Sequence, residues 1–138
     1  MPEVVQYYTT FKIFDQIFAR GAIKPDVVIA SSRFALFSTN EVWEEMSMLN
    51  TRQSMNQLFG SGIHLLRLTF PREVAPYDWP ALCKAERIDV RMAEAFERQA
   101  RQRQATPAEW RCSLMDVWIE KRIEVRQWGG HEWIALPG

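Results

Sequence analysis

Two segments of the sequence, QYYTT at residues 6–10 and RFALFSTN at residues 33–40, decide how we expect this chain to fold. Each is a short apolar run, typical of a β-strand, that ends in polar residues carrying hydroxyl groups. Small-molecule sites commonly lie at such strand ends, because the strand supplies rigidity and the terminal side chains supply contacts. The two segments therefore predict a ligand pocket at the mouth of two neighbouring strands.

The length and composition of the chain indicate how many domains it forms and which classes of partner are disfavoured. The chain has 138 residues, 47% of them hydrophobic, so we expect one domain over residues 1–138. Lys plus Arg and Asp plus Glu number 17 each, which makes the net charge zero. A neutral chain has no general attraction for nucleic acid or for an anionic membrane, and neutrality also disfavours an acidic mimic of DNA.

The N-terminus and the cysteines indicate the compartment. The first five residues, MPEVV, lack the basic region and apolar run of a secretory signal, and no segment reaches the ~20 apolar residues of a membrane span. Cys83 and Cys112 could pair, but in a chain with enough apolar residues for a core we favour free thiols. We expect a cytoplasmic protein without a membrane partner.

Periodicity and capping signals predict the secondary structure. Thr10 is placed to cap a helix whose apolar residues repeat at helical spacing, and Gly21 is placed to end it. The predicted helices span residues 11–20, 41–48, 81–86 and 89–103, with Trp110 in a further short helix after the capping box TPAE. The predicted strands span residues 4–8, 27–30, 34–37, 63–70, 117–119, 122–128 and 132–136, the last two joined by a Gly-Gly hairpin turn. This order lacks the regular alternation of a parallel α/β fold, so we expect an α+β domain with a mostly antiparallel sheet.

The common motifs of phosphate, metal and nucleophile chemistry are absent from the sequence. It contains no Gly-rich phosphate loop, no metal-binding cysteine spacing and no Ser-His-Asp order that the spacing of these residues can support. His64 falls on a predicted core strand and is expected to be a hydrogen-bonded structural residue, whereas His131 follows two glycines and is expected to be exposed. The predicted helix at residues 89–103 interleaves arginine with glutamate, which favours a solvated surface over a phosphate-binding one.

Five short segments carry a family resemblance. They are YYTT, GAIKP, FSTNEVWE, APYDW and PAEW, at residues 7–10, 21–25, 37–44, 75–79 and 107–110. Together they resemble a group of small bacterial and phage proteins, which in turn resembles the ADP-ribosyltransferase fold of the His-Tyr-Glu type. The resemblance implies a split antiparallel sheet whose cleft holds NAD.

The resemblance also implies which residues bind the cofactor. Tyr8 matches the tyrosine that packs on the nicotinamide, and Thr9 follows it as in the family pattern. Ser38 and Thr39 match the end of a second strand that lines the same cleft. Arg33 matches an arginine common in the group, and its guanidinium suits a phosphate because it can donate two parallel hydrogen bonds.

The chain departs from the family at two signature positions. Tyr7 stands where the family has histidine, and Met115 stands roughly where it has the late glutamate. A carboxylate there would stabilise the positive charge that develops on the ribose in the transition state, which methionine cannot do. Asp116 could take this role if the strand bulges, since neighbouring strand residues point to opposite faces. Glu120 and Glu124 are further candidates, although we favour solvated positions for them.

Three functions remain open at this point. The first is an active NAD-dependent mono-ADP-ribosyltransferase with a modified site, in which Tyr7, Tyr8 and Asp116 are the catalytic residues and the acceptor is unknown. The second is a catalytically degenerate transferase fold that acts as an inhibitor by binding a protein target, encoded for example by a phage or mobile element. The third is an interaction module without a ligand cleft.

Overall fold

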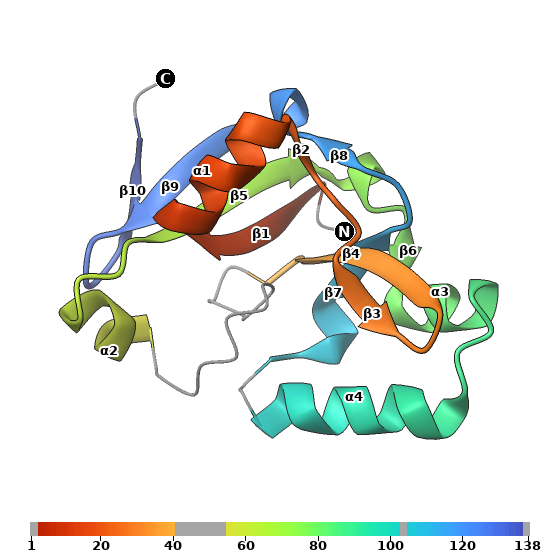
Figure 1. Ribbon diagram of the computed structural model, residues 1–138. Helices are drawn as coiled ribbons and strands as arrows, with labels where there is room; N and C mark the ends of the chain where they lie inside the picture. The colour runs from red at the N-terminus through yellow and green to blue at the C-terminus, as the bar shows by residue number, and fades with distance from the viewer. Residues whose placement is uncertain (1–2, 41–54, 103–104, 137–138) are drawn as a thin grey trace.

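The computed structural model describes residues 3–40, 55–102 and 105–136. Figure 1 shows a twisted sheet with α1 (Phe11–Arg20) above it and α3 (Trp79–Ala85) and α4 (Val90–Gln102) gathered at its other end. A fourth helix, α2 (Met55–Gly60), precedes the long central strand β5. Among the described residues, no helix has the length and apolar character required to cross a membrane.

The main sheet has the strand order β10-β9-β5-β1-β4-β7-β6, with β3 paired to β4, and a separate pair is formed by β2 and β8. All the strand pairs in the described residues are antiparallel, which confirms the predicted α+β class. The strands are β1 (Val4–Thr10), β2 (Ala22–Ile23), β3 (Val27–Ile29), β4 (Ser32–Ser38), β5 (Leu65–Pro71), β6 (Tyr77–Asp78), β7 (Trp110–Ser113), β8 (Val117–Trp118), β9 (Glu124–Trp128) and β10 (Trp133–Ala135).

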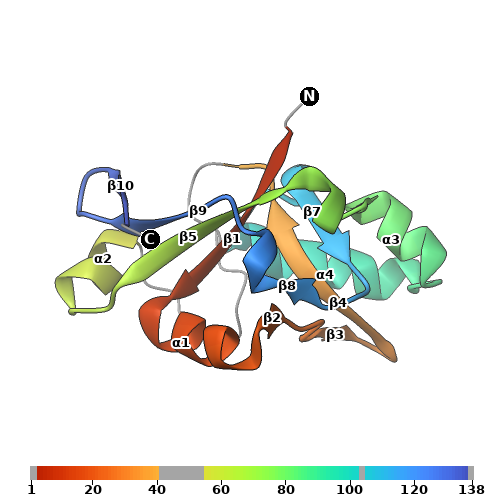
Figure 2. The ribbon, with the colours of Figure 1, turned by 90° about the horizontal axis from the view of Figure 1, so that it is seen from above.

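The sheet is split between β1 and β4. Strand β1 pairs with β5 along its whole length, from Val4 opposite Pro71 to Thr10 opposite Leu65. With β4 it shares only the pair Gln6 and Ser38. Figure 2 shows the two strands diverging in opposite directions from this region. The divergence confirms the predicted split sheet.

Helix α1 begins and ends where the sequence predicts. The Thr10 side chain accepts a hydrogen bond from the Ile13 backbone N–H at 3.4 Å, which satisfies one of the free donors of the first turn. Gly21 follows with φ of 82°, the left-handed conformation that closes a helix. Its N–H donates to the carbonyls of Ile17 and Phe18. These two caps set the length of α1 and direct the chain into β2.

Replacing Gly21 with alanine is expected to lower the free energy of unfolding by about 1 kcal/mol. A Cβ would meet no atom within 4 Å, so the cost comes only from the left-handed backbone. Gly60→Ala is the matched control, because that glycine is also free of close neighbours but has no positive φ. Urea denaturation checks both variants, and equal stability of the two would contradict this account.

The end of the sheet that carries β4 and β7 packs against α3 and α4 through a cluster of four aromatic rings. Trp79, Phe96 and Trp110 are mutually in contact, with ring centroids 5.2 to 5.5 Å apart, and Phe34 lies 5.8 Å from Trp79. These rings come from four different elements, so they hold α3 and α4 against the sheet. Trp79 and Trp110 are accordingly buried in the core.

The structure corrects the prediction for Trp110. We expected it in a short helix, but the helical turn after Thr106 is a 3-10 helix that ends at Glu109, and Trp110 is the first residue of β7. Thr106 makes no capping hydrogen bond with its side chain. The Trp110 ring enters the aromatic cluster while its backbone pairs opposite Ser38. Tertiary contacts therefore override the local capping signal.

The remaining outcomes concern the last hairpin, helix α2, the predicted helix at residues 41–48 and the two cysteines. The predicted hairpin is confirmed by the antiparallel pairing of β9 and β10, but its turn is longer than the two glycines: β9 ends at Trp128 and β10 begins at Trp133, with Gly130 at φ of 101° in the loop. Helix α2 was missed, because its segment shows no strong period in the sequence. The predicted helix at residues 41–48 lies outside the described residues. Cys83 and Cys112 are free, as expected.

Candidate functional site

A pocket of about 270 Å³ lies between α1, the segment from β2 to β3, and β4. Its walls combine apolar side chains with several polar and charged ones. The apolar lining residues are Ile13, Ile17, Ile23, Val27, Ala35 and Leu36, and the polar ones are Tyr7, Gln16, Arg20, Lys24 and Asp26. An apolar hollow with a few convergent polar groups is the usual form of a small-molecule site. We call this hollow the Tyr7 pocket.

Helical spacing explains why α1 supplies so much of the wall. Ile13, Gln16, Ile17 and Arg20 are three or four residues apart, so they share one face of the helix. Gly21 then ends the helix, β2 pairs with β8, and β3 pairs with β4. The pocket therefore depends on the cap of α1 as much as on the strands.

Tyr7 is the central polar residue of the pocket. Its side chain is only 7% exposed, and its ring packs against Phe37 with centroids 5.3 Å apart. The hydroxyl makes no hydrogen bond with the described residues. Burial raises the pKa of Tyr7 to about 12, the negative charge of Asp26 adds to this effect, and Arg20 opposes it. The hydroxyl is therefore protonated at neutral pH and can donate a hydrogen bond to a bound molecule.

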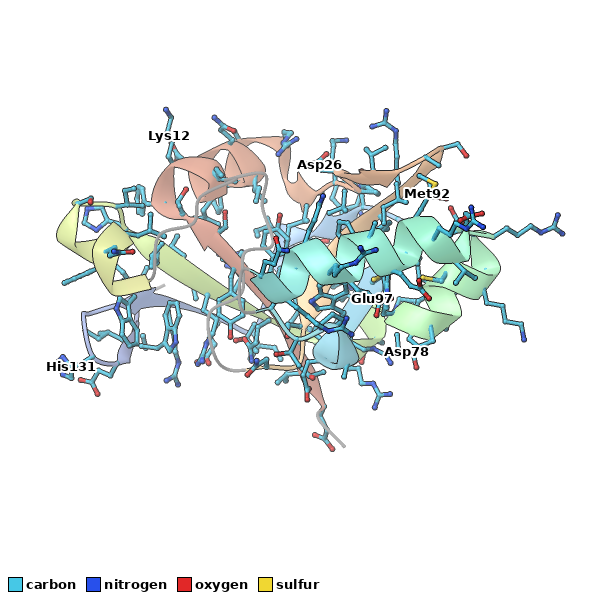
Figure 3. The ribbon with its side chains drawn as sticks, turned by 90° about the horizontal axis from the view of Figure 1, so that it is seen from below. Lys12, Asp26, Asp78, Met92, Glu97 and His131 are labelled. Carbon is cyan, nitrogen blue, oxygen red and sulfur yellow. The ribbon has the colours of Figure 1, made fainter. Side chains whose placement is uncertain are left out.

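Charged residues surround the mouth of the Tyr7 pocket. Lys24 Nζ lies 3.4 Å from Asp116 Oδ2, and both side chains are partly exposed. Arg20 and Asp26 form no ion pair with any residue that the structure describes. Figure 3 shows Asp26 between α1 and the hairpin of β3 and β4, whereas Lys12 projects from α1 into solvent. The mouth therefore presents two cations and one carboxylate, with a second carboxylate bound to Lys24.

Tyr8 lies on the opposite face of β1 from Tyr7, because successive strand residues alternate between faces. Its hydroxyl donates to the Asn40 carbonyl oxygen at 2.6 Å, and its ring lies 5.8 Å from that of Trp133. The two neighbouring tyrosines therefore cannot contact the same small ligand within one pocket. This separation follows from the strand itself and could have been deduced from the sequence.

The other residues that the resemblance assigned to the cofactor are dispersed. Ser38 lies on the Tyr8 side of the sheet, where its Oγ accepts from the Asn40 N–H at 3.0 Å. Thr39 contacts Glu109 through its backbone and through its hydroxyl, which donates to the carboxylate. Thr9 is buried on the Tyr7 face, and its Oγ1 has no partner among the described residues. Arg33 is exposed on β4, two residues before the pocket-lining Ala35.

The carboxylates expected near the site are also placed by the structure. Met115 is 76% exposed, and Asp116 lies at the pocket mouth through its contact with Lys24. Glu120 belongs to a 3-10 helix after β8, and Glu124 pairs with Arg126 at 3.0 Å. The carboxylate that lines the pocket is Asp26, which the sequence analysis did not select.

Asp26 was missed because its segment resembles an ordinary turn. The residues IKPD at positions 23–26 lie between the predicted helix at residues 11–20 and the predicted strand at residues 27–30, and the resemblance segment GAIKP stops one residue before Asp26. The sequence signal that could have indicated Asp26 as a site residue is a polar turn that directly follows a helix cap and precedes a strand. That signal becomes informative only when the turn is known to lie beside Tyr7.

A comparison with protein-family models, with curated proteins and with solved structures found no match to this chain. The assignment of a function therefore rests on the geometry of the Tyr7 pocket, and the resemblance to ADP-ribosyltransferases stays a prediction.

Proposed function

We propose that the protein is an ADP-ribosyltransferase-like protein that binds NAD or a related nucleotide in the Tyr7 pocket. The observation that carries the proposal is Tyr7, a pocket-lining residue whose hydroxyl is protonated at neutral pH and makes no hydrogen bond with the described residues. A ligand that accepts a hydrogen bond from this hydroxyl gains affinity.

The lining of the pocket suits one end of a dinucleotide. Isoleucine side chains from α1 and β2 can pack against a ring or the carbon face of a ribose, and Asp26 can accept hydrogen bonds from ribose hydroxyls. Arg20 and Lys24 at the mouth suit phosphate oxygens. The volume of about 270 Å³ is slightly below the usual range of ligand sites, so part of NAD would lie outside the pocket.

Asp26 is the residue we place beside the reacting ribose if the protein is a transferase. In such a reaction the bond between the ribose and nicotinamide breaks, nicotinamide leaves with the electron pair, and the acceptor adds to the ribose and loses a proton. The carboxylate of Asp26 stabilises the positive charge that the ribose carries in the transition state. Asp116 forms an ion pair with Lys24 and is not among the residues that line the pocket, so we do not assign it this role.

Tyr7→Phe is expected to weaken NAD binding about two- to tenfold, because it removes one hydrogen bond and keeps the ring. Isothermal titration calorimetry measures the change, and a nicotinamide-release assay on the same samples tests for turnover. Tyr77→Phe is the matched control, since Tyr77 lies on β6 and does not line the pocket. Wild-type protein that binds no NAD at millimolar concentration would contradict the proposed function.

Tyr8→Phe distinguishes the two faces of β1. The family resemblance places the nicotinamide on Tyr8, whereas the Tyr7 pocket lies on the other face. If Tyr8→Phe weakens NAD binding and Tyr7→Phe does not, the ligand binds on the Tyr8 side and the Tyr7 pocket is the wrong site.

The second candidate is a degenerate transferase fold that acts as a protein-binding inhibitor. It is favoured by Met115, which is exposed at the position of the family glutamate, and by the separation of Tyr7 from Tyr8. Phe18 and Trp118 are each more than half exposed and could contact a protein target. NAD binding without nicotinamide release would support this candidate over an active enzyme.

A further inference from the structure

We infer that the Tyr7 pocket takes a single phosphorylated ribose, free or as one half of a dinucleotide, whose phosphate replaces Asp116 as the partner of Lys24. This inference rests on the proposed use of the pocket. It adds which chemical unit the pocket selects and which group the phosphate displaces from Lys24. In this account, the Asp116 carboxylate competes with the phosphate for Lys24 and takes no part in catalysis.

Size limits the ligand to one such unit. The cavity of about 270 Å³ is enclosed by α1, by the segment after it and by β4, and its apolar walls contact one ring or sugar. Asp26 also limits the charge of the ligand, because its carboxylate repels a second phosphate placed beside it. Asp26 and Tyr7 together provide an acceptor and a donor for ribose hydroxyls.

Two cations, Arg20 and Lys24, line the pocket. Arg20 is the last residue of α1, and Lys24 follows the two residues of β2, so a short segment carries both side chains to the mouth. Arg20 forms no ion pair with the described residues. A guanidinium can hold two phosphate oxygens at once, and an ammonium can hold a third.

The contact between Lys24 and Asp116 is suited to being displaced. The two charged atoms are 3.4 Å apart, and the side chains are 48% and 36% exposed, respectively. An ion pair with this exposure contributes little net stability, because water and salt screen it. A phosphate carries more negative charge than one carboxylate and also gains Arg20, so it competes favourably for Lys24.

Asp116→Asn is therefore expected to tighten the binding of ribose 5-phosphate about two- to fivefold. NMR titration of the ¹⁵N-labelled protein measures this weak binding, with unphosphorylated ribose as the probe that lacks the anion. Ribose should show no such gain. Asp15→Asn is the matched control, because Asp15 is an exposed carboxylate on α1 that does not line the pocket.

A double variant shows whether Asp116→Asn acts by freeing Lys24 for the phosphate or only by removing one negative charge from the protein. Lys24→Ala should weaken ribose 5-phosphate binding about tenfold, while Lys12→Ala, on the solvent side of α1, should leave it unchanged. In a Lys24→Ala background, Asp116→Asn should no longer tighten binding, because the cation for which the two anions compete is gone.

The outcomes distinguish this inference from the proposed function. If NAD binds in a Tyr7-dependent way but Asp116→Asn does not tighten ribose 5-phosphate binding, the inference is overturned and the function stands. If ribose 5-phosphate binds as described but NAD does not, the inference stands and the NAD proposal fails. Failure of both ligands to bind overturns both.

Discussion

Trp110→Ala is expected to lower the free energy of unfolding by about 3–5 kcal/mol. The side chain is 2% exposed, and its ring contacts Trp79 and Phe96 at centroid distances of 5.2 and 5.5 Å. Truncation would leave a cavity at the point where α3, α4 and β7 meet, and the surrounding rings can fill it only in part. A domain of this size has only about 5–15 kcal/mol of stability, so the loss is a large fraction of the total.

Trp118→Ala is the matched control for this experiment. Trp118 is 52% exposed on β8, so the same truncation removes a similar number of atoms without opening a cavity in the core. We expect it to cost less than about 1 kcal/mol. Urea denaturation followed by circular dichroism measures both variants. Similar losses for the two tryptophans would show that the aromatic cluster does not hold the helices to the sheet.

Stability is expected to fall by roughly 2–3 kcal/mol between pH 9 and pH 12 because of Tyr7 alone. Its pKa is raised from 10.0 to about 12 by burial and by Asp26. In the unfolded chain the phenol loses its proton near pH 10, whereas in the folded protein it keeps the proton to about pH 12. The contribution of Tyr7 to the free energy of unfolding is therefore fully present below pH 10. It is lost as the pH rises from 10 to 12.

Tyr7→Phe tests this pH dependence, because phenylalanine has no proton to lose. Denaturation in urea at pH 8 and at pH 11 should show that wild type loses about 1 kcal/mol more than Tyr7→Phe over this interval. Burial also raises the pKa of the Cys112 thiol, but both proteins share this residue, so the difference between them isolates Tyr7. Equal slopes for the two proteins would show that Tyr7 is accessible to water in the folded state.

Local sequence signals determined the elements around the pocket. Thr10 and Gly21 set the limits of α1 through a hydroxyl cap and a left-handed glycine, both of which depend on a few neighbouring residues. Short β-branched, aromatic and other apolar runs determined β1 and β5, and the order of elements determined the α+β class. The opposite orientations of Tyr7 and Tyr8 also follow from the sequence, although the family resemblance grouped the two residues in one site.

Only the tertiary structure decided what these elements bring together. Trp110 carries a clear capping signal before it, yet it begins a strand, because ring packing and pairing with Ser38 outweigh a short helix. Asp26 and Asp116 are distant from Tyr7 in the sequence, and they reach the pocket only through the turn after α1 and the return of the chain at β8. Capping and alternation act over a few residues and can be read from the chain. The pocket, in contrast, depends on where β1 and β4 separate, which no single segment encodes.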